Sequence, residues 1–227
     1  MTTDPKSRSR GKKERVKTAR GRTSSSTRWL QRQLNDPYVA EARRLGYRSR
    51  AAFKLKEIAE KHDLFKGVKT VVDLGAAPGG WCQVMREIAP KVKILAVDLQ
   101  EIEPVPGVEF ILGDFLEDAA YQTILDKTSG GVDAVISDMA NAATGHRQTD
   151  HLRTMVLCEA GLDFALEVLN PGGFFLSKVL RGGTEGELLG TLKKNFKTIR
   201  HLKPPSSRQD SRELFVLATG FKGRAQP

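Results

Sequence analysis

Three aspartates are the residues whose spacing first suggests chemistry in this chain. Asp98, Asp114 and Asp138 each stand at or just after the end of a short apolar run that is typical of a buried strand. Because the carboxyl ends of parallel strands meet at one edge of a sheet, these carboxylates should gather there. One such aspartate alone would predict an ordinary turn or helix cap, so the shared placement carries the interpretation.

A glycine-rich segment supplies the second part of this candidate site. Residues 72–81, VDLGAAPGGW, follow the first apolar run and lead into a helical stretch. Glycines there let the backbone turn sharply and approach a ligand. The segment lacks the G-x-G-x-x-G spacing of dinucleotide-binding loops, and Pro78 is foreign to that motif. An acid after the second strand can accept ribose hydroxyls, and an acid after the third can accept the adenine amine. We therefore predict an adenosine pocket without a pyrophosphate cradle, which favours S-adenosylmethionine over NAD.

The elements that must position these residues follow an alternating pattern. Apolar runs occur at 70–72, 94–97, 110–112, 134–136 and 174–176, with helical stretches at 81–88, 116–127 and 153–168 between them. This β-α-β-α alternation predicts an open parallel sheet with right-handed crossovers. Two final runs, 199–202 and 214–218, are joined by a Pro/Ser loop and predict an antiparallel edge hairpin. The expected fold is a Rossmann-like α/β fold with a mostly parallel seven-stranded sheet and helices on both faces.

Charge is distributed unevenly along the chain. The net charge is +10, and residues 1–28 hold ten Lys or Arg against two acidic residues. We predict a disordered basic tail over 1–28, one folded domain over 29–221 and a short C-terminal tail over 222–227. A basic arm with almost no apolar residues suits a polyanion such as nucleic acid. A merely solubilising terminus and an organelle transit peptide are the alternatives.

Composition excludes several other classes of protein. Cys82 and Cys158 are the only cysteines, which favours neither a disulfide framework nor a zinc site and indicates a reducing compartment. No apolar run approaches the roughly 20 residues of a membrane span. We expect a monomer that binds no metal and no membrane.

Several segments together give the chain a specific resemblance. They are residues 48–55 (RSRAAFKL), 73–81, 137–140 (SDMA), 177–179 (SKV), 206–208 (SSR) and 211–213 (SRE). From about Trp29 to Phe221 the chain resembles the FtsJ/RrmJ family of RNA ribose methyltransferases. The resemblance implies methyl transfer from S-adenosylmethionine to a ribose 2′-hydroxyl, most specifically of a uridine in the A loop of large-subunit (23S) ribosomal RNA. It also implies a bacterial cytoplasmic location, with a mitochondrial one as the alternative.

The same resemblance assigns roles to particular residues. A catalytic tetrad maps onto Lys54, Asp138, Lys178 and Glu213. The methyl donor would be contacted at Gly79, Gly80, Trp81, Asp98, Asp114 and Asp138.

Lys178 also stands out without the resemblance, because it closes the apolar run 174–176 where a buried strand would prefer an aliphatic residue. It could act as a base or aim a lone pair of the hydroxyl. A helix is also predicted over about residues 49–62, and Arg48, Arg50 and Lys56, on or beside this helix that carries Lys54, would help to place RNA.

Other functions remain open at this stage. Amino-directed base methyltransferases need a polar-Pro-Pro-aromatic loop, whereas Asp138 is followed by Met139 and Ala140. Carbon-directed ones need a nucleophilic cysteine, and both cysteines fall in predicted helices as core residues. A small-molecule methyltransferase would not need the basic arm. A ribosome-assembly factor with little catalysis, or a methyltransferase acting on another RNA, is the main alternative.

Overall fold

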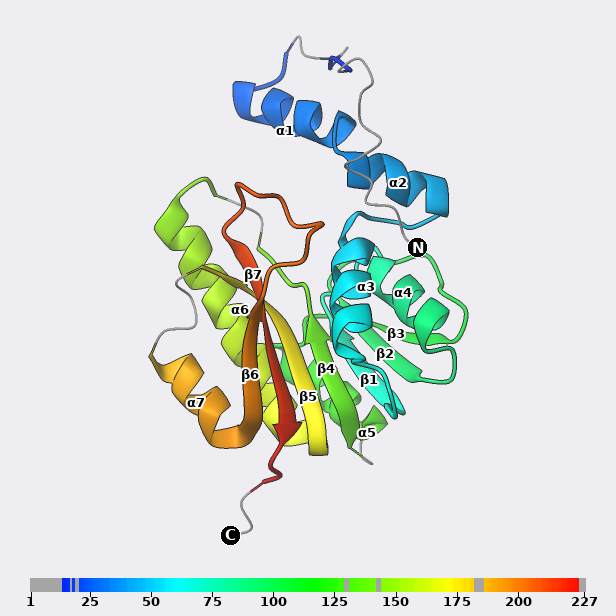
Figure 1. Cartoon of the computed structure of the whole chain (residues 1–227), viewed down its shortest axis with the longest axis vertical. Coiled ribbons are helices and arrows are strands. Elements are labelled where there is room, and N and C mark those ends of the chain that lie inside the picture. The colour runs from blue at the N-terminus through cyan, green and yellow to red at the C-terminus, as the bar shows by residue number, and fades with distance from the viewer. Residues whose placement is uncertain are drawn as a thin grey trace.

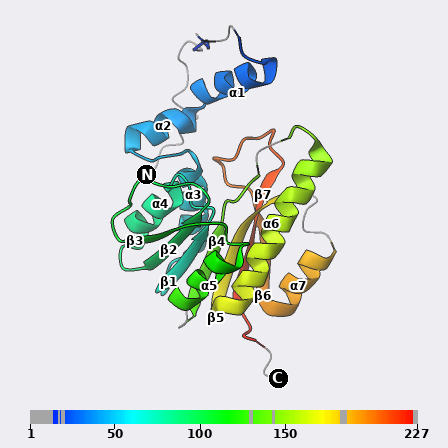
Figure 2. The same cartoon turned by 180° about the vertical axis from the view of Figure 1, so that it is seen from behind.

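The computed structural model describes residues 14–16, 18, 21–128, 131–141, 144–181 and 186–224. Most of the predicted basic tail and residues 225–227 of the C-terminal tail lie outside these ranges. The described chain forms one sheet covered by helices on both faces, with two further helices at one end (Figures 1 and 2).

The sheet has seven strands in the order β3-β2-β1-β4-β5-β7-β6. Their bounds are β1 Thr70–Leu74, β2 Lys93–Asp98, β3 Val108–Leu112, β4 Val132–Ser137, β5 Leu169–Leu180, β6 Phe196–Leu202 and β7 Glu213–Phe221. Strands β1 to β5 pair in parallel, and β7 runs antiparallel to both of its neighbours, β5 and β6. This arrangement confirms the predicted mostly parallel sheet with an antiparallel pair at one edge.

Two layers of helices bury the sheet. One core cluster joins the sheet to α3 (Ala51–His62) and α4 (Gly80–Ile88) through residues such as Leu55 and Met85. The opposite cluster joins it to α5 (Asp118–Lys127), α6 (Arg147–Val168) and α7 (Glu187–Asn195). The sequence analysis did not predict α7, whose Leu188 and Leu192 pack into the second cluster.

Two further helices, α1 (Ser24–Leu34) and α2 (Pro37–Leu45), precede α3 in the chain. Asp36 caps α2 by accepting a hydrogen bond from the backbone of Tyr38, and Pro37 occupies the first turn, where its lack of an N–H is tolerated. Thr23 caps α1, so this helix begins inside the segment 1–28 that was predicted as a disordered tail. Backbone groups of Glu14 also hydrogen-bond to the Asn35 side chain, which holds residues 14–16 beside α1.

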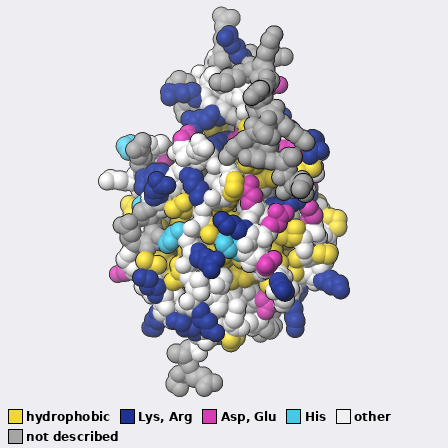
Figure 3. Space-filling model, viewed as in Figure 1, with side chains coloured by type: hydrophobic (Ala, Val, Ile, Leu, Met, Phe, Trp, Pro, Cys, Tyr) yellow, Lys and Arg dark blue, Asp and Glu magenta, His cyan; other side chains and the backbone are white. Residues whose placement is uncertain are grey.

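The surface of the folded part carries its own basic region. Figure 3 shows Lys and Arg side chains gathered over β6 and α7, where Lys193, Lys194, Lys197 and Arg200 are exposed. Within the described ranges, no helix is long and apolar enough to cross a membrane. Nor do the described residues contain a cluster of His, Cys, Asp or Glu that could hold a metal ion.

Candidate active site

Strand register brings two members of the predicted tetrad, Asp138 and Lys178, together. Ser137 at the end of β4 is the register partner of Ser177 on β5, so the residues that follow them, Asp138 and Lys178, lie side by side. Glu213 begins the antiparallel strand β7 opposite Leu180, which brings its carboxylate to the same edge. Lys54 approaches from α3, which packs on the sheet.

The four charged side chains form one ion-paired cluster. Lys54 Nζ lies 2.8 Å from Glu213 Oε2 and 3.5 Å from Asp138 Oδ2. Lys178 Nζ lies 2.7 Å from Asp138 Oδ1 and 3.9 Å from Glu213 Oε2, and it donates a 2.7 Å hydrogen bond to the Asp138 carbonyl. The four side chains are between 10% and 17% exposed, so solvent reaches them only partly. Two cations and two anions leave the cluster with no net formal charge.

Neighbouring charges stabilise the ionised forms of two members of the cluster, Lys54 and Asp138. Burial by itself would lower the pKa of Lys54, but the charges of Asp138 and Glu213 outweigh it and raise that pKa above its ordinary value. Burial would likewise raise the pKa of Asp138, and the neighbouring Lys178 and Lys54 reverse this effect and lower it. Lys54 and Asp138 therefore stay ionised at neutral pH.

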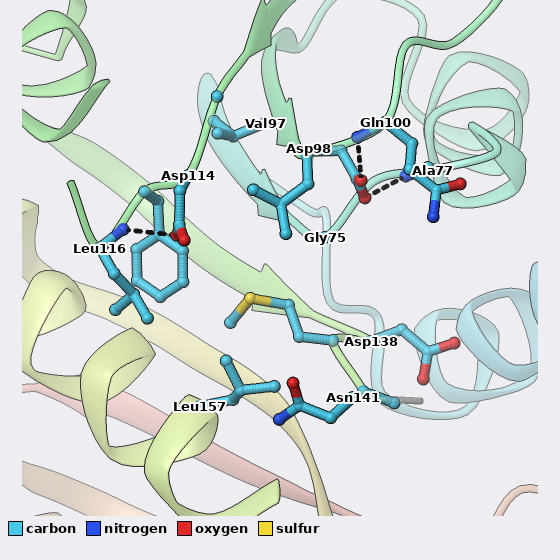
Figure 4. Close-up of a pocket in the computed structure, with 15 residues that line it drawn as sticks. Gly75, Ala77, Val97, Asp98, Gln100, Asp114, Leu116, Asp138, Asn141 and Leu157 are labelled. Atoms are coloured by element: carbon cyan, nitrogen blue, oxygen red, sulfur yellow. Dashed lines mark hydrogen bonds between the residues drawn. The ribbon is translucent and has the colours of Figure 1, made fainter. Parts of the chain in front are cut away.

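A cavity of about 360 Å³ adjoins the cluster and shares Asp138 with it. Figure 4 shows Asp98 and Asp114 on the cavity wall at neighbouring strand ends. The Asp98 carboxylate accepts 2.8 Å hydrogen bonds from the backbone of Ala77 and Gln100, and Asp114 accepts one of 3.0 Å from Leu116. Both carboxylates are thus fixed by main-chain donors at the carboxyl edge of the sheet.

Residues 79–81 occupy a different position from these aspartates. The described residues that line the cavity include Asp98, Asp114 and Asp138 but not Gly79, Gly80 or Trp81. The Trp81 ring is buried against Phe215, and its indole N–H donates to the Ala51 carbonyl at 2.9 Å. Gly79 is the N-terminal cap of α4, and within the described chain no side chain caps that helix. The first-turn N–H groups of α4 are therefore the groups that residues 79–81 can offer to an anionic ligand.

Several cavity residues had escaped the sequence analysis. Met139 and Leu157 form apolar wall, and Gln100 and Asn141 add polar groups. Met139 and Asn141 lie just beyond a strand end, which is a signal that could have found them. Leu157 sits in the long helix α6, where an apolar residue carries no such signal.

The basic residues near Lys54 all have partners within the chain, and their expected role toward RNA stays a prediction. Arg48 donates to the carbonyls of Pro78, Glu103 and Pro104. Arg50 pairs with Asp36, and Lys56 pairs with Glu87 at 2.6 Å. These three side chains hold segments of the fold together.

The sheet order, the cavity and the partly buried charged cluster define an α/β fold of the doubly wound type with its candidate site at the carboxyl edge of the sheet. Residues 47–221 match the model of the FtsJ-like methyltransferase family. The chain belongs to this family and is a methyltransferase.

Individual relatives agree with this assignment. The chain is 57% identical over 211 residues to the ribosomal RNA large subunit methyltransferase E of Novosphingobium aromaticivorans, covering 93% of this chain and 95% of the relative. The protein of the same name from Parvibaculum lavamentivorans is 55% identical over 231 residues, covering 96% and 90%. A crystal structure from Plasmodium falciparum, described as a ribosomal RNA methyltransferase, is 32% identical with a TM-score of 0.70, covering 78% of this chain and 100% of that one.

Proposed function

We propose that this enzyme transfers a methyl group from S-adenosylmethionine to a ribose 2′-hydroxyl of large-subunit ribosomal RNA, at a uridine of the A loop in 23S RNA. The observation that carries the proposal is the position of Asp138, which lines the nucleoside-sized cavity and also pairs with Lys54 and Lys178. A donor in the cavity and an acceptor at the cluster would therefore be neighbours. The names of the bacterial relatives support ribosomal RNA as the substrate. The bacterial cytoplasm, where ribosomes are made, is the location that this substrate implies.

The cavity residues fit the donor. S-adenosylmethionine supplies a methyl group activated by its sulfonium charge. Asp98 would accept the ribose hydroxyls, Asp114 would face the adenine, and the first turn of α4 would receive the carboxylate. A Cβ at Gly75 would stand 2.4 Å from Met139 Cγ, so only glycine leaves the cavity wall undisturbed there.

Lys178 would act on the acceptor hydroxyl. Its ammonium group has three N–H donors. One serves the Asp138 carbonyl and another faces the Asp138 carboxylate, which leaves one for the ribose oxygen. Such a hydrogen bond would aim an oxygen lone pair at the methyl carbon, and orientation of this kind contributes about 7–11 kcal/mol. The C–O bond then forms as the C–S bond breaks, and the hydroxyl proton passes to water or to a neighbouring carboxylate.

The proposal is tested by two linked measurements. The purified protein, given labelled S-adenosylmethionine, should methylate large ribosomal subunits or their RNA from cells that lack it. Mapping of ribose methylation in those cells should show one unmethylated A-loop uridine that the gene restores. Donor binding by calorimetry without any methyl transfer would instead favour an assembly factor, and transfer to a different RNA would overturn the assigned substrate.

A further inference from the structure

The loop between β6 and β7 carries two serines that are more buried than loop serines usually are. Ser206 is 1% exposed and Ser207 is 4% exposed. Together with Arg208 they form the segment 206–208, which the proposed chemistry has not used. On one side the segment is held by contacts with the start of α2 and with α3. On the other side it contacts Glu213 of the charged cluster.

The outer side of the segment is held by the start of α2. The Asp36 carboxylate, 7% exposed, accepts hydrogen bonds from Arg208 Nε at 3.2 Å and Nη2 at 3.1 Å. The same carboxylate oxygen pairs with Arg50, whose guanidinium also donates to the Ser206 carbonyl. Charge-assisted bonds of this kind, when shielded from solvent, fix geometry well.

The helix that carries Lys54 holds the segment as well. Glu57, one turn beyond Lys54 on α3, accepts hydrogen bonds from the Ser206 backbone N–H at 2.9 Å and from its hydroxyl at 2.7 Å. The loop is therefore fixed relative to the helix from which Lys54 reaches the cluster.

The inner side of the segment touches Glu213. Ser207 Oγ donates to Glu213 Oε1 at 3.1 Å, while Glu213 Oε2 accepts from Lys54 at 2.8 Å. Each oxygen of the carboxylate thus has its own donor, which permits one orientation of the side chain. The backbone N–H of Glu213 also donates to Ser211 Oγ at 3.1 Å, so main chain and side chain are both held.

We propose that Ser207 is a positioning residue for methyl transfer, which keeps Glu213 oriented toward Lys54 and Lys178. The inference rests on the proposed function, because Glu213 has a task only if the charged cluster acts on the acceptor. Ser207 itself lies behind Glu213 and has no direct part in the transfer.

The test compares two neighbouring serine variants in the full-length protein. Ser207→Ala should lower kcat for methylation of large subunits about tenfold, the effect of losing one hydrogen bond to a charged group. The KM values for donor and RNA should stay within about twofold, since neither ligand loses a contact. Ser207→Thr keeps the hydroxyl and should restore kcat. Ser206→Ala is the matched control and should cost less, because its backbone N–H still binds Glu57.

Two outcomes would overturn the inference. One is an unchanged kcat in Ser207→Ala. The other is an equal loss of kcat and of thermal stability in both alanine variants, which would mean that the loop only needs to fold. Absence of methyl transfer by the unaltered enzyme would count against the proposed function instead, so the two failures are distinguishable.

Discussion

Asp138 and Lys178 are 40 positions apart in the sequence, yet Lys178 Nζ lies 2.7 Å from Asp138 Oδ1. The pairing of Ser137 with Ser177 on adjacent parallel strands produces this contact. A parallel register fixes which side chains emerge together at the carboxyl edge, so the ion pair is a property of the sheet.

The first prediction concerns a variant in which Lys178, one partner of this ion pair, is replaced. Lys178→Ala should lower the single-turnover rate of methyl transfer by at least about a hundredfold, because the N–H group aimed at the reacting oxygen is lost. The affinity for S-adenosylmethionine, measured by calorimetry, should change little, since Lys178 is not among the described residues that line the cavity. Lys197→Ala, which alters an exposed lysine on β6, is the control. A near-normal single-turnover rate in Lys178→Ala would exclude Lys178 from the reaction.

Asp98 should determine donor affinity. Asp98→Ala is expected to weaken binding of S-adenosylmethionine by about 1.5–3 kcal/mol, the effect of a hydrogen bond to a charged group. The variant also leaves Ala77 N–H and Gln100 N–H without their acceptor, so its thermal stability should be measured beside its affinity. Glu101→Ala, an exposed acid close by, serves as the control. Unchanged affinity would place the ribose elsewhere.

Asp73 should make stability depend on pH. This side chain is almost wholly buried, and burial raises its pKa to about 7; the Cys82 thiol hydrogen bond opposes this shift, and the charges of Asp138 and Asp98 add to it. An unfolded aspartate ionises near pH ~3.9, so the native state holds an extra proton between about pH 4 and 7 and loses stability as pH rises through that window.

Asp73→Asn should cancel this dependence. The Tm of the variant relative to the unaltered protein should rise between pH 5 and 7 and level off above that, as followed by scanning calorimetry. Asp133→Asn is an informative control, because backbone N–H groups of Lys69 and Thr70 help to hold the Asp133 pKa below its usual range against the effect of burial. Its Tm difference should stay constant over the same window. A Tm difference between Asp73→Asn and the unaltered protein that stays constant from pH 5 to 7 would show that Asp73 is ionised throughout that range.

Gly75 and Gly46 allow backbone strain to be separated from crowding. Both have φ near 77°, so alanine costs each about 1–2 kcal/mol of left-handed strain. Only the Cβ of Gly75→Ala would meet Met139 Cγ, at 2.4 Å, whereas Gly46→Ala meets nothing within 4 Å. Urea unfolding should therefore show a further loss of about 1–3 kcal/mol in Gly75→Ala. Equal losses would mean that Met139 can move aside freely.

The tail prediction takes a new boundary from the structure. Removing residues 1–22 keeps the Thr23 cap of α1 and deletes nine Lys or Arg against two acidic residues. Binding to ribosomal RNA should weaken, and four lost phosphate contacts would reduce the slope of log affinity against log salt by about 3. Turnover at saturating RNA should persist. If affinity and slope both stay unchanged, the transit-peptide interpretation of the tail becomes the stronger one.

Sequence alone could predict the sheet because parallel strands buried on both faces leave apolar runs, each followed by a polar residue at the functional edge. Asp98, Asp114 and Asp138 were found in this way, and the structure places them on one cavity. No comparable sequence pattern indicates Lys54 or Glu213, since a helix lysine and a strand-end glutamate are usually solvated. Their assignment came from the family resemblance, and the structure brings both to the cluster.

Sequence patterns could not predict which groups the side chains would contact in the folded chain. Arg48 and Arg50 were expected to help place RNA, and no sequence pattern indicated that Arg48 binds carbonyl groups or that Arg50 pairs with Asp36. A cation in a sequence does not reveal whether its counter-charge is a ligand or another segment of the chain. Trp81 is a second example, because its position after the glycine-rich segment does not predict that its ring is buried against Phe215.

The insertion of β7 between β5 and β6 also bears on how the enzyme is made. Ribosomes synthesise a chain from its N-terminus, so β6 leaves the ribosome before the strand that must join it to β5. Glu213, the last member of the charged cluster, is the first residue of that strand. A nascent chain, or one shortened by a late stop codon, would lack Glu213 together with the buried residues of β7, among them Phe215 and Val216. The core of the sheet and the charged cluster would therefore be completed by the same late-synthesised strand.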